Sequence, residues 1–133
     1  MTKIFLDSNI CIYAFDRTDI RKQQIAFDLL RRFPVISSQI IIETYNACTR
    51  KLKISPVVCD ENSLFLCDIT NVFEINATVI RTAVAFKTKY LLSFLDACIV
   101  ATAYHANCSI LYSEDLHNNL KIEGTMTILN PFL

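Results

Sequence analysis

The sequence is poor in the residues that break regular structure. Its 133 residues include one glycine, Gly124, and three prolines. Flexible linkers and low-complexity segments are therefore absent, and the composition indicates a compact, largely helical chain. A chain with one glycine also lacks the loops G-x-x-x-x-G-K-[ST] and G-x-G-x-x-G that cradle nucleotide phosphates, so we expect no binding of ATP or NAD.

Long hydrophobic runs are missing as well. The apolar residues 4–6 stand alone between Lys3 and Asp7, which is far short of a signal peptide. The longest segment without Asp, Glu, Lys or Arg, residues 97–113, is interrupted by polar side chains, whereas a membrane span needs about 20 mostly apolar residues. We expect a cytoplasmic protein without a transmembrane helix. Its length and its 53% apolar content predict a single domain over residues 1–133.

Neither sign of charge is in excess, and the cysteines form no pattern. Thirteen basic and thirteen acidic residues give a net charge of zero, so a polyanion has to be bound by a local patch and not by an overall field. The six cysteines are dispersed without a C-x-x-C pair, and most lie in apolar segments. We expect free thiols packed in the core, not disulfides or zinc ligands.

Apolar periodicity predicts strands and helices in alternation. The expected strands cover residues 3–6, 35–36, 72–75, 109–112 and 126–129. The expected helices cover residues 8–15, 20–32, 39–52, 56–67, 77–89 and 94–106, with N-caps at Ser37 or Ser38, Asn76 and Ser93. This alternation predicts an α/β fold, with a parallel sheet covered by helices on both faces.

Two aspartates directly follow predicted strands. Asp7 ends the first apolar run, and Asp115 lies just past the strand at 109–112. Ligands of open parallel sheets bind at the carboxyl edge of the strands, so both acids are expected at one edge. An aspartate after a strand is also a common turn former or helix cap, and that alternative stays open for each of the two.

Two further acids lie on predicted helices. Glu43 shares a helical stripe with Ile40 and Ala47, which points its carboxylate inward, although a partly exposed Glu43 fits the pattern equally well. A buried carboxylate is costly unless it meets a cation or several donors. Asp96 follows Ser93 by three residues, which is typical of a capping box, and it also begins the stripe expected to pack on the sheet.

Four carboxylates in these places indicate metal-dependent hydrolysis of a phosphodiester. Closely spaced carboxylates repel one another without a cation, and hard ions such as Mg²⁺ prefer oxygen ligands. One or two bound ions can lower the pKa of a water molecule and offset the charge on the leaving oxygen. No histidine or serine nucleophile is then needed, and the spacing of His105 and His117 does not suggest a charge-relay site.

Five segments together resemble the PIN-domain nucleases, especially the VapC-like ribonuclease toxins of bacterial toxin-antitoxin systems. The similarity spans the whole chain, and its most specific part is the segment around Asp96. The segments are residues 5–10 (FLDSNI), 38–43 (SQIIIE), 92–97 (LSFLDA), 110–116 (ILYSEDL) and 128–132 (ILNPF).

The resemblance implies a three-layer α/β/α PIN-like domain with a central parallel sheet of about five strands. It also implies Mg²⁺- or Mn²⁺-dependent endonucleolytic cleavage of RNA. The residues matching the family's acidic, metal-binding centre are Asp7, Glu43, Asp96 and Asp115, and Asn9 and Ser113 match positions that support it. Toxins of this family commonly dimerise and are silenced by a small antitoxin that inserts into the active-site groove.

One departure from the family concerns the segment after Asp115. Many relatives carry a glycine or another acid there, where this chain has Asn118 and Asn119. Asparagine tolerates the left-handed backbone conformation, so the turn is expected to survive, but a second metal ion has weaker support.

The preferred hypothesis is therefore a metal-dependent endoribonuclease. Two alternatives are a non-catalytic binding or scaffold module, in which the acids serve as caps, and a metal-dependent phosphatase. A scaffold predicts no binding of Mg²⁺ or Mn²⁺, and a phosphatase predicts turnover of phosphomonoesters. The sequence leaves transfer, ribosomal and messenger RNA all open as targets.

Overall fold

The computed structural model describes residues 2–133, and every expected strand and helix is present with its ends within two residues. The strands are β1 (Ile4–Leu6), β2 (Val35–Ser37), β3 (Asn71–Phe73), β4 (Ile110–Tyr112), β5 (Lys121–Ile122) and β6 (Met126–Leu129). The helices are α1 (Ser8–Ala14), α2 (Ile20–Leu30), α3 (Ser38–Arg50), α4 (Pro56–Ile69), α5 (Ala77–Lys89) and α6 (Phe94–His105). The sequence did not predict β5, because a strand of two residues has no periodicity to read.

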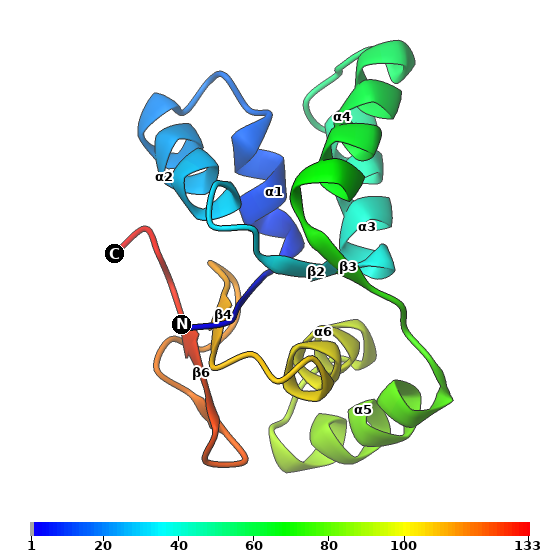
Figure 1. The fold of residues 1–133 in the computed structure, drawn as a ribbon, viewed down its shortest axis with the longest axis vertical. Helices are drawn as coiled ribbons and strands as arrows, with labels where there is room; N and C mark the ends of the chain where they lie inside the picture. The colour runs from blue at the N-terminus through cyan, green and yellow to red at the C-terminus, as the bar shows by residue number, and fades with distance from the viewer. Residues whose placement is uncertain (1) are drawn as a thin grey trace.

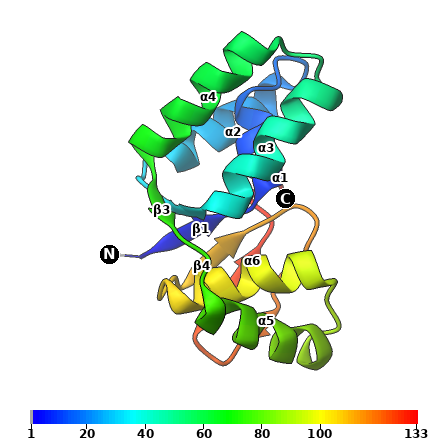
Figure 2. The ribbon, with the colours of Figure 1, turned by 90° about the vertical axis from the view of Figure 1, so that its right-hand side faces the viewer.

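The sheet is parallel except at one edge. Its strand order is β3-β2-β1-β4-β6-β5, and only β5 runs antiparallel to its neighbour. Helices α1 to α4 cover one face, and α5 and α6 cover the other (Figures 1 and 2). The fold is thus the expected three-layer α/β/α arrangement, with five parallel strands and one antiparallel edge strand.

The central strand β1 determines where the carboxyl ends of the strands meet. Its three residues are buried, and it pairs with β2 on one side and β4 on the other. Leu6 lies opposite Tyr112, and the backbone N–H of Asp7 donates to the Tyr112 carbonyl oxygen at 2.9 Å. Asp7 and Ser113 therefore leave the sheet side by side, at the edge where open α/β sheets bind ligands.

Helix α6 supplies much of the core on the second face. Residues 97–103 are buried without interruption, because the sheet lies on one side of this helix and α5 lies on the other.

Five of the six cysteines are buried and all six are free, as the dispersed pattern predicted, while Cys67 on α4 is exposed. Among residues 2–133, no helix is long and apolar enough to cross a membrane.

Local signals account for the helix starts and for several helix ends. Ser37, Asn76 and Ser93 each accept a hydrogen bond from the backbone N–H three residues later, as predicted for N-caps. With a single glycine available, the left-handed conformation is adopted by other residues. These are Phe33, Lys53, Leu91, Asn107, Asn119 and Glu123, each with φ between +51° and +71°. The value at Asn119 agrees with the turn expected there.

Candidate active site

Asp7 is both a helix cap and a buried acid at the carboxyl edge of the sheet. It is the N-cap of α1, and one carboxylate oxygen accepts from the Ser8 backbone N–H at 2.6 Å. The other oxygen accepts from the Ser113 hydroxyl at 2.7 Å. Only 4% of Asp7 is exposed, so these bonds hold the carboxylate in one orientation. The two interpretations of Asp7 left open by the sequence are therefore compatible.

Asn9 connects Asp7 with Asp115. Its amide nitrogen lies 3.4 Å from Asp7 Oδ2, 3.4 Å from Ser113 Oγ and 3.2 Å from Asp115 Oδ2. Its amide oxygen accepts from the Glu114 backbone N–H at 3.2 Å. One side chain of α1 thus contacts the turn after β4 at several points, and it brings two of the four acids together.

Ser113 organises the turn that carries Asp115. Its hydroxyl oxygen accepts from the backbone N–H groups of Asp115 and Leu116, each at 3.2 Å, while its proton is directed to Asp7. Ser113 is fully buried, whereas Asp115 is exposed. The turn therefore presents a solvent-accessible carboxylate on a rigid backbone.

Glu43 and Asp96 approach the same region from two helices. Glu43 is half-buried on α3, and Gln39 donates to its carboxylate at 3.0 Å and to the Leu95 carbonyl oxygen at 3.2 Å. This contact joins α3 to the first turn of α6. Asp96 lies in that turn, is half-buried, and its backbone N–H is capped by Ser93 at 3.2 Å.

The electrostatics of Asp7 reflect both its burial and its neighbours. Burial, together with the smaller effect of the charges of Glu43 and Asp96, raises its pKa from 3.8 to about 6, and the hydrogen bonds from Ser113 and Ser8 limit this rise. Within residues 2–133, no lysine, arginine or histidine forms an ion pair with any of the four acids. The negative charge at this edge is thus not balanced by the protein itself.

The donor chemistry of this region fits a hard divalent cation. All candidate ligands are carboxylate oxygens, which Mg²⁺ and Mn²⁺ prefer, and a cation would relieve the repulsion acting on Asp7. In the part of the chain that the structure describes, no group of three acidic, histidine or cysteine side chains already converges on one point. Binding an ion would therefore draw the more exposed carboxylates, Asp115 above all, toward Asp7.

A comparison with known protein families identifies the family to which this chain belongs. The sequence profile of the PIN domain matches residues 4–119, which include β1, β4 and all four acids. The chain belongs to the PIN domain family. A comparison with curated proteins gave no significant match.

Solved structures share the PIN fold at low sequence identity. VapC20 of Mycobacterium tuberculosis, described as a toxin that cleaves the sarcin-ricin loop, is 18% identical with a TM-score of 0.70, over 85% of this chain and 90% of that one. A toxin-antitoxin complex from Klebsiella pneumoniae is 22% identical with a TM-score of 0.71, over 98% of both chains. DNA-bound VapBC from Salmonella typhimurium is 17% identical with a TM-score of 0.73, over 98% of this chain and 99% of that one.

A cleft of about 440 Å³ lies between α1 and α3 of this PIN domain. Glu43 and Asp115 line it, and Asp7 is bonded to Ser8 and Asn9, which line it as well. Asp96 does not belong to the lining. The remaining lining residues are Ile12, Tyr13, Asp16, Ala47, Lys51, Leu52 and Glu114.

One ion-paired acid that lines the cleft of this PIN domain, Glu114, was not predicted from the sequence. Lys22 and the Tyr13 hydroxyl donate to its carboxylate at 2.5 Å and 2.6 Å. Burial alone would raise the pKa of Glu114, but these hydrogen bonds outweigh it and hold the pKa below its usual range. Its place directly before Asp115 was visible in the sequence, but its partners on α1 and α2 depend on the tertiary structure.

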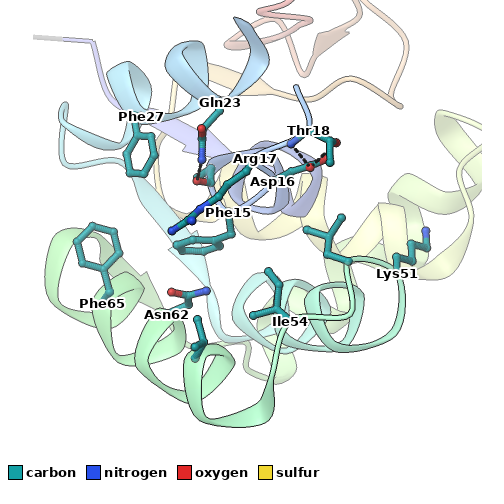
Figure 3. Close-up of a pocket in the computed structure, with 13 residues that line it drawn as sticks. Phe15, Asp16, Arg17, Thr18, Gln23, Phe27, Lys51, Ile54, Asn62 and Phe65 are labelled. Carbon is teal, nitrogen blue, oxygen red and sulfur yellow. Dashed lines mark hydrogen bonds between the residues drawn. The ribbon is translucent and has the colours of Figure 1, made fainter. Parts of the chain in front are cut away.

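A larger cavity of about 870 Å³ adjoins the cleft and shares Asp16, Lys51 and Leu52 with it. Its wall is mainly apolar and includes the rings of Phe15 and Phe65 (Figure 3). The other lining residues are Ala14, Arg17, Thr18, Gln23, Phe27, Ile54, Val58 and Asn62. The acidic cleft of this PIN domain thus opens at its outer end into an apolar cavity.

Proposed function

We propose that this protein is a Mg²⁺- or Mn²⁺-dependent endoribonuclease that acts as the toxin of a toxin-antitoxin pair. The observation that carries the proposal is the unbalanced group of carboxylates at the carboxyl edge of a PIN-domain sheet. Burial and the neighbouring charges of Glu43 and Asp96 raise the pKa of Asp7 to about 6, which marks a site that stabilises positive charge. The toxins and toxin-antitoxin complexes among the structural neighbours support the same biological role.

In the proposed reaction, the metal would be held by Asp7, Glu43, Asp96 and Asp115. A divalent ion held there would lower the pKa of a water molecule that attacks the phosphorus and would offset the charge on the leaving 3′ oxygen, so that the products would carry 3′-hydroxyl and 5′-phosphate ends. Asp7 is fixed by Ser113 and Ser8 and supplies a rigid ligand. Asp115 is exposed, tethered by Asn9, and supplies a ligand that can follow the ion. Asn9 and Ser113 act by orienting these carboxylates.

Cleavage of RNA by carboxylate variants tests the reaction. Asp7→Asn and Asp96→Asn should each abolish endonucleolytic cleavage in Mg²⁺, because each removes one negative ligand without changing side-chain size. Glu74→Gln is the matched control, since Glu74 is exposed between β3 and α5 and lines neither the cleft nor the cavity. If both aspartate variants cleave as fast as the parent in contaminant-free preparations, the mechanism is wrong.

Metal binding separates the nuclease from the two alternatives. Calorimetry with Mn²⁺ should show binding by the parent chain and its loss in Glu43→Gln. A scaffold module would bind no ion above background, with or without the substitution. A phosphatase would bind the ion but release phosphate from monoesters without cutting RNA internally.

The proposed partner is a small antitoxin protein. The neighbours from Klebsiella pneumoniae and Salmonella typhimurium are toxin-antitoxin assemblies, and the cavity beside the cleft offers this chain an apolar surface for a polypeptide. A basic side chain on such a partner would also meet the unbalanced acids. Co-expression with the product of a small adjacent reading frame, followed by co-purification and loss of nuclease activity, tests this part.

A homodimer is the other proposed assembly. Ile42 on α3 and Leu95 on α6 are 61% and 60% exposed, and the Gln39 contact with Leu95 places them on adjoining elements. Scattering measurements should give twice the chain mass for the parent and one chain mass for Leu95→Glu. Leu64→Glu, at a 67% exposed position on α4, is the control that should leave the mass unchanged. A monomeric parent would refute the dimer.

A further inference from the structure

Residues 130–132 follow β6 and contact both α1 and α2. Phe132 is only 7% exposed, and its carbonyl oxygen accepts from the Arg21 guanidinium at 2.7 Å. Its backbone N–H donates to the side-chain oxygen of Asn130 at 2.9 Å, which closes a tight turn of the backbone. The ring and the backbone of Phe132 are therefore both held in place.

The ring of Phe132 packs on the two side chains that bind Glu114. The rings of Phe132 and Tyr13 meet edge to face, with centroids 5.1 Å apart. The ammonium of Lys22 lies 5.2 Å from the centre of the Phe132 ring and 4.6 Å from that of Tyr13. Hydrogen bonds to Glu114 and Tyr13 raise the pKa of Lys22 to about 12, so this ammonium is charged at neutral pH. Two aromatic rings thus hold the cation that pairs with Glu114.

The same segment also contacts the far side of the turn that carries Asp115. The backbone N–H of Asn130 donates to the side-chain oxygen of Asn118 at 2.7 Å. Glu114 directly precedes Asp115, and Asn118 follows it by three residues. Contacts that lead back to residues 130–132 therefore hold the chain on both sides of this acid.

We propose that Phe132 is a positioning residue of the acidic site, which fixes the turn of Asp115 through Lys22 and Glu114. The inference rests on the proposed function, because it treats Asp115 as a metal ligand. Asp115 is exposed, so the place of its carboxylate depends on the backbone of its turn. A turn that is ordered before the ion arrives loses less conformational entropy on binding.

The mobility of the turn in the metal-free chain is the first test. Phe132→Leu keeps an apolar side chain and removes the ring that holds Lys22. By ¹⁵N relaxation, the order parameters of the Glu114 and Asp115 amides should fall from about 0.85 in the parent toward about 0.6 in this variant. They report fast local motion in the folded state, so a lower free energy of unfolding alone does not change them.

Metal affinity shows whether Phe132 acts through Glu114. Removing a group that directly orients a metal ligand lowers affinity by about 10-fold or more, and Phe132 acts at a greater remove, so Phe132→Leu should lower Mn²⁺ affinity by about fivefold in calorimetry. In a Glu114→Gln background it should cause no further loss, because the two residues act in one chain of contacts. A merely structural role of Phe132 predicts losses that multiply in the double variant.

Phe86→Leu is the matched control. Phe86 is 3% exposed, and its ring meets that of Tyr90 edge to face at 5.3 Å. Tyr90 and Lys89 donate to Glu123, so this cluster repeats the same arrangement, and it does not line the cleft. Phe86→Leu should lower the midpoint of urea unfolding, as Phe132→Leu does. It should leave the order parameters of the turn and the Mn²⁺ affinity unchanged.

Unchanged order parameters in Phe132→Leu overturn the proposal, and so do equal changes in Phe86→Leu or losses that multiply in the double variant. If Phe132→Leu does not fold, Arg21→Ala takes its place, because Arg21 is exposed and its loss frees the Phe132 carbonyl without altering the core. Unchanged order parameters in Arg21→Ala then overturn the proposal. A parent chain that binds no Mn²⁺ refutes the proposed function, while the order parameters of the metal-free chain still decide whether Phe132 positions the turn.

Discussion

The hydroxyl of Ser113 donates a 2.7 Å hydrogen bond to the carboxylate of Asp7, across 106 positions of the sequence. The bond forms because β1 and β4 are parallel neighbours, with Leu6 opposite Tyr112. It favours the ionised form of Asp7, against the burial that raises the pKa of this group to about 6. Ser113 therefore keeps Asp7 able to bind a cation near neutral pH.

Replacing Ser113 should shift the pH dependence of metal binding. A hydrogen bond to a charged group is worth about 1.5 kcal/mol, or about one pKa unit. In Ser113→Ala the pKa of Asp7 should therefore rise above 6, and protons should compete with Mn²⁺ up to a higher pH. Calorimetric titrations at a series of pH values measure the midpoint. Ser109→Ala, near the opposite end of β4, is the control that should leave the midpoint in place.

Asp7→Asn should stabilise the metal-free protein at neutral pH. Between pH 3.8 and about 6, the folded state binds more protons at Asp7 than the unfolded state, so the free energy of unfolding falls as the pH rises through this window. Each pKa unit is worth about 1.4 kcal/mol, so the ionised carboxylate destabilises the fold by about 3 kcal/mol above pH 6. The asparagine variant avoids much of this loss.

Urea denaturation at two pH values checks this expectation. Asp7→Asn should unfold at a higher urea concentration than the parent at pH 7, and the difference should vanish near pH 4. Added Mg²⁺ should raise the midpoint of the parent and leave the variant unaffected, because only the parent offers the buried carboxylate to the ion. If the parent is more stable than Asp7→Asn at pH 7 without metal, the ionised carboxylate of Asp7 does not destabilise the fold and this expectation is wrong.

Glu114→Gln should weaken metal binding without unfolding the protein. Lys22 and Tyr13 donate to the carboxylate of Glu114, and the backbone N–H of Glu114 donates to Asn9. These contacts of Glu114 fix the turn that carries Asp115. A partly exposed ion pair contributes about 1 kcal/mol or less to stability. Because the pKa of Glu114 is lowered, this contribution is present at neutral pH and is lost as the pH falls through the folded-state pKa.

Glu123→Gln is the matched control for Glu114→Gln. Glu123 is likewise paired with a lysine, Lys89, and with the hydroxyl of Tyr90, but it lies in the hairpin between β5 and β6. Calorimetry should show reduced Mn²⁺ affinity for Glu114→Gln and an unchanged value for Glu123→Gln. Equal affinities in the two variants would show that the ion pair of Glu114 does not position Asp115.

Leu91→Gly should stabilise the protein. Helix α5 ends with the Leu92 N–H bonded to the Lys87 carbonyl oxygen at 3.0 Å, which leaves Leu91 in the left-handed position with φ +55°. A side chain there costs about 1 to 2 kcal/mol, and Leu91 is 90% exposed, so little packing is lost. The larger backbone entropy of unfolded glycine offsets part of the gain, which leaves about 0.5 kcal/mol.

The equivalent position after α6 provides the comparison for Leu91. There Asn107 has φ +60°, and the Cys108 N–H bonds to the Ala103 carbonyl oxygen at 3.1 Å. Asparagine tolerates this conformation better than leucine, so Asn107→Gly should change the thermal midpoint less than Leu91→Gly does. A larger gain at Asn107 would show that backbone strain is not what limits stability at Leu91.

Much of the fold could be predicted from local patterns. Helix α5 was predicted with its observed bounds, because its apolar spacing and the cap at Asn76 act within a few residues of each other. The two-residue strand β5 could not be predicted, since it exists only through its pairing with β6. Among the acids, Glu43 was expected to point inward or to be partly exposed, and it is half-buried beside a cleft that periodicity cannot describe.

The sequence by itself determined the alternation of strands and helices, the N-caps and the positions of four acids relative to them, because these depend on contacts within a few residues. The tertiary structure alone decided that Asn9 reaches Asp115, that Lys22 neutralises Glu114, and that Lys51 lies at the far end of the acidic cleft. The first two contacts join residues 106 and 92 positions apart. They form because the order of a parallel sheet places β4 beside β1, and no local pattern encodes that order.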